Sequence, residues 1–148
     1  MFSEGWALYA ESLGKELGMF TDPYMWYGRL NDEQLRAMRL VVDTGLHAKG
    51  WSREKAIAYM LENSSMAESD AGAEVERYIS IPGQALAYKV GERHIRHLRN
   101  QATEALGEDF DIKAFHSNIL TDGAMPMPIL SEKMSMWIDE VKSKNQGE

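Results

Sequence analysis

The chain has 148 residues, of which 44% are hydrophobic and 26% are charged, values typical of one globular domain with a sizeable core. Its 23 acidic and 16 basic residues give a formal net charge of −7, which argues against a nucleic-acid-binding surface. The absence of cysteine excludes a disulfide framework and a thiolate zinc site. No apolar run approaches the about 18 residues of a membrane-spanning helix, so we expect no transmembrane segment in this chain.

No stretch alternates β-branched and polar residues, so we predict an all-α fold, a multi-helix bundle that the whole chain forms as a single domain. The first helix should cover Phe2–Leu17 and end at Gly18, because glycine readily adopts the left-handed conformation found at helix C-termini. Asp22 and Pro23 are typical of a helix start. We expect the following Tyr24–Leu30 segment to form a short helix or turn with its aromatic side chains on the core.

The later helices are predicted from start and stop signals along the chain. Asn31-Asp32-Glu33 is a second start signal, which separates Tyr24–Leu30 from a new helix ending near Lys49. Ser52 suits an N-cap, and Pro82-Gly83 predicts a tight connection, because the residue before a proline avoids the helical conformation. The further expected helices are 53–62, 71–78, 84–106, 111–120 and 129–144, with an extended linker at 125–128 and a frayed tail at 145–148.

Two acidic residues of the first helix share one of its faces. Glu4 and Glu11 lie seven residues apart and point away from the apolar stripe that contains Trp6 and Tyr9. One interpretation is the solvated acidic face of a surface helix. Gly5 argues for a special environment, because glycine within a helix costs about 1 kcal/mol relative to alanine. The other interpretation is therefore a helix that enters a buried site.

A charged stripe is predicted on the helix that covers residues 35–47. Arg36, Arg39, Asp43 and His47 fall within a narrow band, and the rest of the circumference is largely apolar. A helix with that pattern is buried, and its charges are then paired or face a cleft. Two arginines in a cleft would suit a substrate carboxylate, and Asp43 could orient the imidazole of His47. The alternative is an exposed face with pairs worth a few tenths of a kcal/mol each.

A third informative stretch follows Tyr78. Gln84 and Tyr88 lie one helical turn apart after the Pro82-Gly83 connection, so they share a face. A tyrosine hydroxyl at this place could donate a hydrogen bond to an oxyanion. The competing interpretation is that Tyr78 and Tyr88 are core aromatic residues with satisfied hydroxyl groups.

The segment Glu4-Gly5-Trp6-Ala7-Leu8-Tyr9-Ala10-Glu11 resembles a signature of the bacterial domain-of-unknown-function family 885. The resemblance runs over almost the whole chain, through residues 43–47, residues 82–88 and Phe115-His116. That family resembles the gluzincin metallopeptidases, in which a His-Glu-x-x-His helix supplies two zinc ligands and a general base, and a later helix supplies a glutamate ligand. Glu4 matches the position of this glutamate.

The resemblance implies a zinc-dependent peptidase acting on a peptide substrate. The implied roles are zinc ligation for Glu4, catalysis for His47, Tyr88 and Tyr78, substrate binding for Arg36, Arg39 and Gln84, and support of the site by Asp43 and Glu11. It also implies a periplasmic or lipoprotein-anchored location, although this chain carries no export signal.

No His-Glu-x-x-His motif occurs in the chain. We therefore expect it to be the C-terminal part of a larger helical metallopeptidase-like domain, inactive in isolation and without tightly bound zinc. Separation from the rest of that domain would expose apolar surface on this chain, and this surface would favour a homodimer. The alternative is a non-enzymatic helical interaction or scaffold module, which requires no missing motif.

Overall fold

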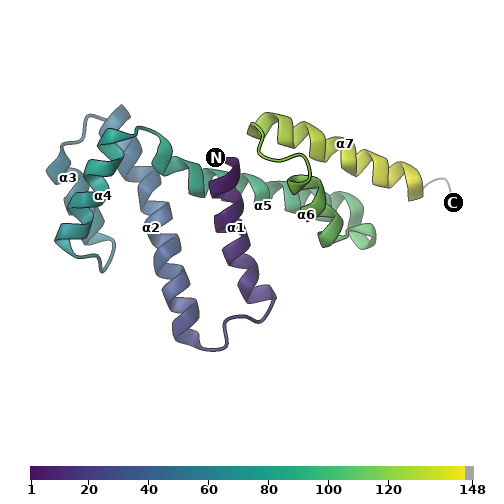
Figure 1. The fold of residues 1–148 in the computed structure, drawn as a ribbon, viewed down its shortest axis with the longest axis horizontal. Coiled ribbons are helices and arrows are strands. Elements are labelled where there is room, and N and C mark those ends of the chain that lie inside the picture. Colours follow the sequence, from purple (N-terminus) through teal and green to yellow (C-terminus); the bar gives the residue numbers. More distant parts are fainter. Residues whose placement is uncertain (146–148) are drawn as a thin grey trace.

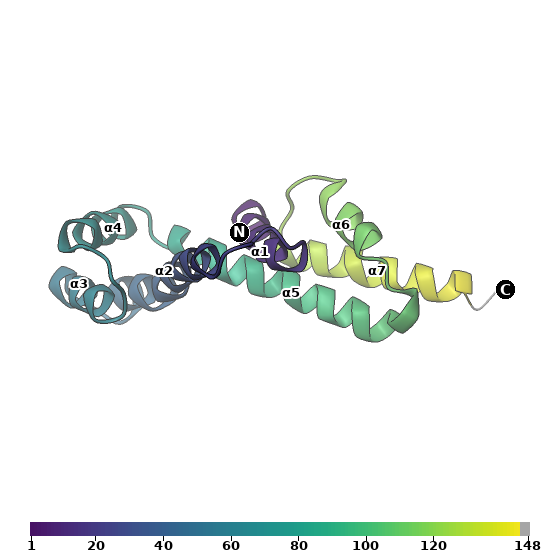
Figure 2. The ribbon, with the colours of Figure 1, turned by 90° about the horizontal axis from the view of Figure 1, so that it is seen from below.

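The computed structural model describes residues 1–145, and the secondary structure of this part of the chain is helical, without strands, as predicted. Helix α5 forms a central spine that α1 crosses, with α2, α3 and α4 toward one end and α6 and α7 toward the other (Figure 1). Seen from below, α7 lies beside α5 (Figure 2). The elements are α1 (Phe2–Glu16), α2 (Pro23–Ala48), α3 (Arg53–Glu62), α4 (Glu68–Ser80), the 3-10 helix η1 (Gln84–Leu86), α5 (Ala87–Leu106), the 3-10 helix η2 (Gly107–Asp109), α6 (Ile112–Leu120) and α7 (Met127–Asn145).

Local sequence signals set several helix boundaries. The Asp22 carboxylate accepts a hydrogen bond of 2.6 Å from the Tyr24 backbone N–H ahead of α2, and the Ser52 hydroxyl accepts one of 3.2 Å from Lys55 ahead of α3. After α1, Gly18 adopts φ 68°, a conformation that glycine enters without strain. These starts and this stop agree with the predictions.

The predicted break at Asn31 is wrong, because α2 is one continuous helix from Pro23 to Ala48. An ion pair between Arg29 and Glu33, one turn apart, spans the expected break. The prediction that the aromatic segment packs on the core is also wrong, since α2 continues straight and its first turns, which carry this segment, lie at the free end of the α1–α2 hairpin (Figure 1). The exposed fractions are 83% for Tyr24, 49% for Met25, 61% for Tyr27 and 42% for Leu30.

Three other predicted boundaries differ from the structure. Helix α4 begins at Glu68, earlier than expected, with no side-chain cap. The predicted helix 84–106 begins with the 3-10 turn η1, and α7 begins at Met127, since a proline such as Pro128 is tolerated in a first helical turn. Of the tail predicted to fray, Asn145 ends α7 and residues 146–148 lie outside the described range.

Gly5 and Gly91 form the point where α1 crosses α5. A Cβ atom on Gly5 would lie 2.5 Å from the Gly91 backbone, and one on Gly91 would lie 2.5 Å from the Met1 carbonyl oxygen. The two backbones are therefore in direct contact, which only glycine at both positions permits. This crossing explains the unfavourable glycine inside α1 and fixes the position of Glu4, the preceding residue.

The apolar side chains form two separate clusters, one on each side of the crossing. One joins α1, α5, α6 and α7, and the other joins α2, α3, α4 and η1. The first contains Phe2, Tyr9, Ile95, Leu98, Ala102, Phe115, Ile119, Leu130 and Met134, and the second contains Val42, Ala56, Met60, Ala71, Val75, Tyr78 and Ala85. Within residues 1–145, no helix is both long and apolar enough to cross a bilayer.

Candidate functional site

The predicted site residues come from five elements that meet near the start of α1. Glu4 lies in the first turn of α1, the charged stripe on α2, Tyr78 in the last turn of α4, Gln84 in η1 and Tyr88 at the start of α5. Figure 1 shows the start of α1 close to the start of α5, with the upper part of α2 beside them. Residues far apart in the sequence are thereby brought together.

A chain of hydrogen bonds joins α2 to α1 through η1. Arg39 Nη2 donates to Gln84 Oε1 at 3.0 Å, and Gln84 Nε2 donates to Glu4 Oε1 at 3.2 Å. Arg39 is 3% exposed, whereas Gln84 and Glu4 are half-buried. No hydrogen bond within residues 1–145 engages the second oxygen of Glu4. Arg39 of the α2 stripe is thus linked to Glu4 through Gln84.

The two arginines of the stripe stack on tyrosine rings. The Arg39 guanidinium carbon lies 5.1 Å from the ring centroid of Tyr78 and 4.9 Å from that of Tyr88. The Arg36 guanidinium carbon lies 5.3 Å from the Tyr88 centroid. Cation–π contacts of this kind contribute about 0.5–2 kcal/mol, more as water is excluded. Arg39 is thus buried against two rings, whereas Arg36 lies against one ring and is half-buried.

Asp43 holds the turn that precedes Gln84. Both of its carboxylate oxygens accept from the Gly83 backbone N–H, at 3.2 and 3.0 Å, and the side chain is 3% exposed. Gly83 has φ 80°, the left-handed conformation at which a side chain would be strained. The predicted partnership of Asp43 with His47 has no hydrogen bond in the structure, because Asp43 is committed to this turn.

His47 contacts the end of α4. Its Nε2 lies 3.0 Å from the carbonyl oxygen of Tyr78, and the residue as a whole is exposed. An imidazole N–H at a helix C-terminus satisfies a carbonyl that lacks a partner within the helix. His47 therefore fastens α2 to α4, and its ring is not bonded to Glu4 or Gln84.

The two tyrosines differ in what their hydroxyl groups contact. The Tyr78 hydroxyl donates to Glu74 at 2.5 Å, and the residue is fully buried. Burial raises the pKa of Tyr78, and the bond to the Glu74 carboxylate raises it further. The half-buried Tyr88 has no hydrogen bond to its hydroxyl within residues 1–145. Tyr88 is thus the tyrosine whose hydroxyl is free to donate to a ligand.

Glu11 is separated from these residues. It is exposed and, with Arg29, lines a mostly apolar cavity of about 510 Å³ between α1 and α2. Glu11 is two helical turns beyond Glu4, which corresponds to about 10 Å along the axis. The structure does not bring the predicted supporting residue Glu11 into contact with Glu4.

A metal ion needs more ligands than this chain brings together. Within residues 1–145, no three His, Asp or Glu side chains converge on a point that could hold a metal. Zinc in proteins usually has three or four protein ligands. The residues present therefore do not form a zinc site by themselves, although Glu4 has an oxygen available for one ligand position.

Two polar networks near the site were not predicted. Between α2 and α5, Glu33 pairs with Arg29 and Lys89, and Lys89 also pairs at 3.0 Å with Glu92, which is 1% exposed. Burial acts to raise the pKa of Glu92, but hydrogen bonds from Arg96 and Lys89 bring it below its ordinary value. The i, i+3 and i, i+4 spacing of these charges in α5 was a usable signal, but the sequence does not reveal their partner on α2.

The second network joins α1, α5 and α6. The buried Tyr9 hydroxyl lies 2.9 Å from His116 Nε2 and accepts from Arg99 Nη1 at 3.4 Å, while Arg99 binds both Glu16 oxygens at 2.9 and 2.8 Å. Burial lowers the pKa of His116, and the Arg99 charge lowers it further. This network closes the far side of α1, where His116 joins α6 to α1.

A family model described as "Bacterial protein of unknown function (DUF885)" matches residues 1–134. The chain belongs to this family. Membership in DUF885 agrees with the resemblance carried by the Glu4–Glu11 segment and leaves the activity open, because no function is established by the family description. No curated protein matches the chain.

Two solved structures are similar to this DUF885 chain. A "putative lipoprotein" from Colwellia psychrerythraea is 53% identical to this chain, with a TM-score of 0.92, and the match covers 94% of this chain and 24% of the Colwellia chain. The second is a protein from Shewanella oneidensis, described as a "putative lipoprotein of unknown function". It is 30% identical to this chain, with a TM-score of 0.84, and the match covers 90% of this chain and 24% of the Shewanella chain. This chain thus spans about a quarter of the length of the solved structures that it matches.

Proposed function

We propose that this DUF885 chain is the part of a gluzincin-type zinc peptidase that supplies the glutamate ligand and one wall of the substrate site. The single observation that carries this proposal is the half-buried Glu4 carboxylate, which binds Gln84 through one oxygen and has no hydrogen bond at the other from the residues that the structure describes. The remaining ligands and the general base would come from residues that this chain does not contain. A zinc ion held there would supply Lewis-acid activation of a water molecule.

The chain's own residues have defined tasks in this proposal. Tyr88, whose hydroxyl is unbonded within the described residues, donates to the oxyanion that develops on the substrate carbonyl. Arg36, stacked on the Tyr88 ring, binds a carboxylate of the peptide. His47 stays a predicted second donor, which requires its ring to leave the Tyr78 carbonyl. Tyr78 contributes its ring to the enclosure of Arg39.

A chimera tests the proposal. This chain would replace the matching quarter of the Colwellia psychrerythraea protein, a graft that 53% identity and a TM-score of 0.92 favour. We expect the chimera to hold one zinc per molecule and to cleave members of a peptide library, with both properties lost on Glu4→Ala. Tyr88→Phe should lower turnover by about 10²–10³ while the zinc content is unchanged, because one oxyanion donor is removed.

The control is Tyr24→Phe, at an 83% exposed position on α2, which should leave turnover unchanged. A folded chimera that holds no zinc and cleaves no peptide would contradict the proposal. The interaction-module alternative would then be favoured, and co-purification with a protein partner would be its next test.

The isolated chain should bind zinc weakly and without defined stoichiometry. One carboxylate cannot hold Zn²⁺ in a closed site, and no metal-binding group is present within residues 1–145. Metal analysis of the chain purified without an affinity tag checks this. One tightly held zinc per chain would contradict the assignment of the other ligands to residues outside it.

We also infer an exported protein attached to a membrane by lipid. The descriptions of the Colwellia and Shewanella proteins support this location. Fractionation of cells that express the full-length gene product, with and without inhibition of lipoprotein processing, would test it.

A further inference from the structure

We propose that Arg39 and Gln84 are a positioning pair that holds the Glu4 carboxylate in one orientation, rather than residues that bind substrate. The inference deepens the proposed function, on which it rests for the identity of the group that Glu4 binds. The arrangement of the three side chains stands independently of that identity.

Arg39 is unsuited to bind a substrate. Its side chain is 3% exposed, and its guanidinium lies between the rings of Tyr78 and Tyr88. Its Nη2 already donates to Gln84, and its Nε is buried without a hydrogen-bond partner. Little of this guanidinium is therefore open to a ligand. Arg39 is therefore a fixed donor inside the protein.

A fixed donor determines which way the Gln84 amide points. A guanidinium has only N–H groups, so the Gln84 atom that faces Arg39 must be the carbonyl oxygen. The amide nitrogen is then directed toward Glu4, to which it donates at 3.2 Å. Without Arg39, the amide could rotate and present its oxygen to the Glu4 carboxylate, an arrangement that places two acceptors together.

The backbone at Gln84 is also held. The Asp43 carboxylate binds the N–H of Gly83, whose left-handed conformation sets the direction in which η1 begins. Both residues of the α2 stripe that are buried, Arg39 and Asp43, therefore act on the segment that carries Gln84. This convergence explains why an arginine and an aspartate persist in a buried position.

The consequence falls on Glu4. With Oε1 occupied by the Gln84 amide, the carboxylate presents Oε2 as its available oxygen, which is the geometry of a monodentate ligand. Groups that hold a metal ligand in place typically contribute about 10–100-fold to metal affinity. Gln84 would act on the metal through Glu4, without touching it.

NMR of the ¹⁵N-labelled chain tests the pair directly. We expect the Gln84 side-chain amide protons to resonate apart from those of the exposed Gln101, with one proton shifted downfield by the Glu4 carboxylate. Glu4→Ala should return this proton toward the Gln101 position. Arg39→Lys should broaden or move the Gln84 signals, because the fork that fixes the amide is lost. The matched control, Arg93→Lys at an exposed position on α5, should leave them unchanged.

The wild-type spectrum alone can overturn the inference, whether or not every variant folds. Gln84 amide signals of the wild-type chain that coincide with those of the exposed Gln101 would show that no such pair exists. In the chimera, Gln84→Glu keeps the acceptor for Arg39 but removes the donor to Glu4, and we expect a 10–100-fold loss of zinc affinity. Gln101→Glu, the same change at an exposed site, should have no effect, and equal zinc affinity in the two variants would contradict the inference.

The two proposals fail separately. A chimera that binds no zinc through Glu4 would refute the proposed function, while the NMR result would still decide on the positioning pair. A zinc-binding chimera with an uncoupled Gln84 amide would refute the pair and leave the proposed function in place.

Discussion

At the scale of single residues, Gly5 and Gly91 show how a local cost becomes a tertiary requirement. Each glycine is unfavourable within a helix by about 1 kcal/mol. Each also lacks the Cβ atom that would fall 2.5 Å from the backbone of the crossing helix. By helix propensity alone, alanine at either position would be stabilising. At this crossing, however, its Cβ atom would clash with the backbone of the other helix, and the two backbones cannot move apart without separating α1 from α5.

We therefore expect Gly5→Ala to destabilise the chain by about 1–3 kcal/mol, the usual cost of overpacking, despite the gain in helix propensity. The control is Gly28→Ala in α2, where a Cβ meets no atom within 4 Å, and which should stabilise by up to about 1 kcal/mol. Urea unfolding of the two variants measures both changes. Equal stabilisation by both would contradict the close crossing.

His116 gives a prediction on pH. Its pKa is lowered in the folded chain by burial and by Arg99, whereas in the unfolded chain it should be near its ordinary value of about 6.5. The unfolded state then binds the proton more readily, so this contribution to stability is present above about pH 6.5 and is lost as pH falls through the folded-state value. His94, whose pKa burial also lowers, acts in the same direction.

The urea concentration at the midpoint of unfolding should therefore decrease as the pH is lowered from about 7.5 to about 5.5. His116→Gln should reduce that fall, and the matched change at the exposed His97 should not. If His116→Gln leaves the pH dependence of the midpoint as it is in the wild type, His116 does not carry the effect.

At the scale of elements, α2 is held by charges that its own sequence could not reveal. Glu33 lies between Arg29 on the same helix and Lys89 on α5. Arg29 is 8% exposed, and two of its nitrogens are buried without hydrogen-bond partners. Burial lowers the pKa of Arg29. The carboxylate of Glu33 thus pairs with two cations in the α2–α5 contact, of which Lys89 also pairs with Glu92.

Glu33→Gln should destabilise the chain by about 1–3 kcal/mol, because Arg29 loses its counter-charge and Lys89 keeps only its pair with Glu92. Breaking a fully buried ion pair costs about 3–5 kcal/mol. The effect here should be smaller, since the Glu33 side chain is 24% exposed. Glu104→Gln, at an exposed position on α5, is the control. Thermal unfolding followed by circular dichroism would measure the difference, and identical melting of the two variants would show that the network contributes nothing.

Helix starts and stops were predictable where a side chain or a glycine acts locally, as at Asp22, Ser52 and Gly18. The continuity of α2 through Asn31 was not, because a start signal within a helix is overridden once an ion pair that spans it, here Arg29–Glu33, favours the helical path. In the site, spacing placed Arg39 and Asp43 together on one face. It could not show that both serve Gln84, since that contact depends on how α2 meets η1.

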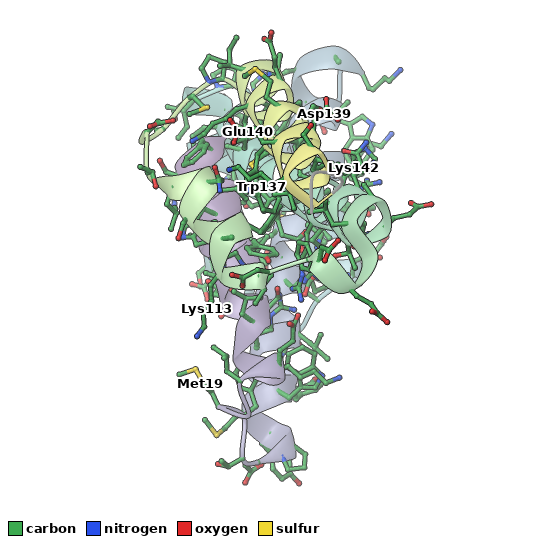
Figure 3. The ribbon with its side chains drawn as sticks, turned by 90° about the vertical axis from the view of Figure 1, so that its right-hand side faces the viewer. Met19, Lys113, Trp137, Asp139, Glu140 and Lys142 are labelled. Atoms are coloured by element: carbon green, nitrogen blue, oxygen red, sulfur yellow. The ribbon has the colours of Figure 1, made fainter. Side chains whose placement is uncertain are left out.

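At the scale of the whole molecule, the free end of the α1–α2 hairpin is apolar. Leu17 is 72% exposed and Met19 64%, and Met19 projects from the connection between the helices (Figure 3). The cavity of about 510 Å³ between α1 and α2 opens in the same region. Monomeric proteins rarely leave contiguous apolar patches of more than a few hundred Å² exposed.

The isolated chain should self-associate at high concentration, as a twofold dimer that covers this hairpin end. Light scattering coupled to size exclusion measures the mass, and Leu17→Lys together with Tyr24→Lys should shift the population to monomer. The matched control is a pair of lysines at Ser143 and Ser135 on α7, both exposed. A wild-type chain that stays monomeric over the whole concentration range would contradict this prediction.

The Gly5–Gly91 contact is also the pivot about which α1 would tilt against α5. From Gly5 to the end of α1 the helix extends about 16 Å, whereas Glu4 is only about 1.5 Å from the contact along the axis. A tilt of α1 by about 10° would move the hairpin end by about 3 Å and the Glu4 backbone by about 0.3 Å. A partner that packs against the hairpin and displaces the Glu16–Arg99 pair would therefore move the long arm, while the short arm would keep the Glu4 carboxylate in register with Gln84.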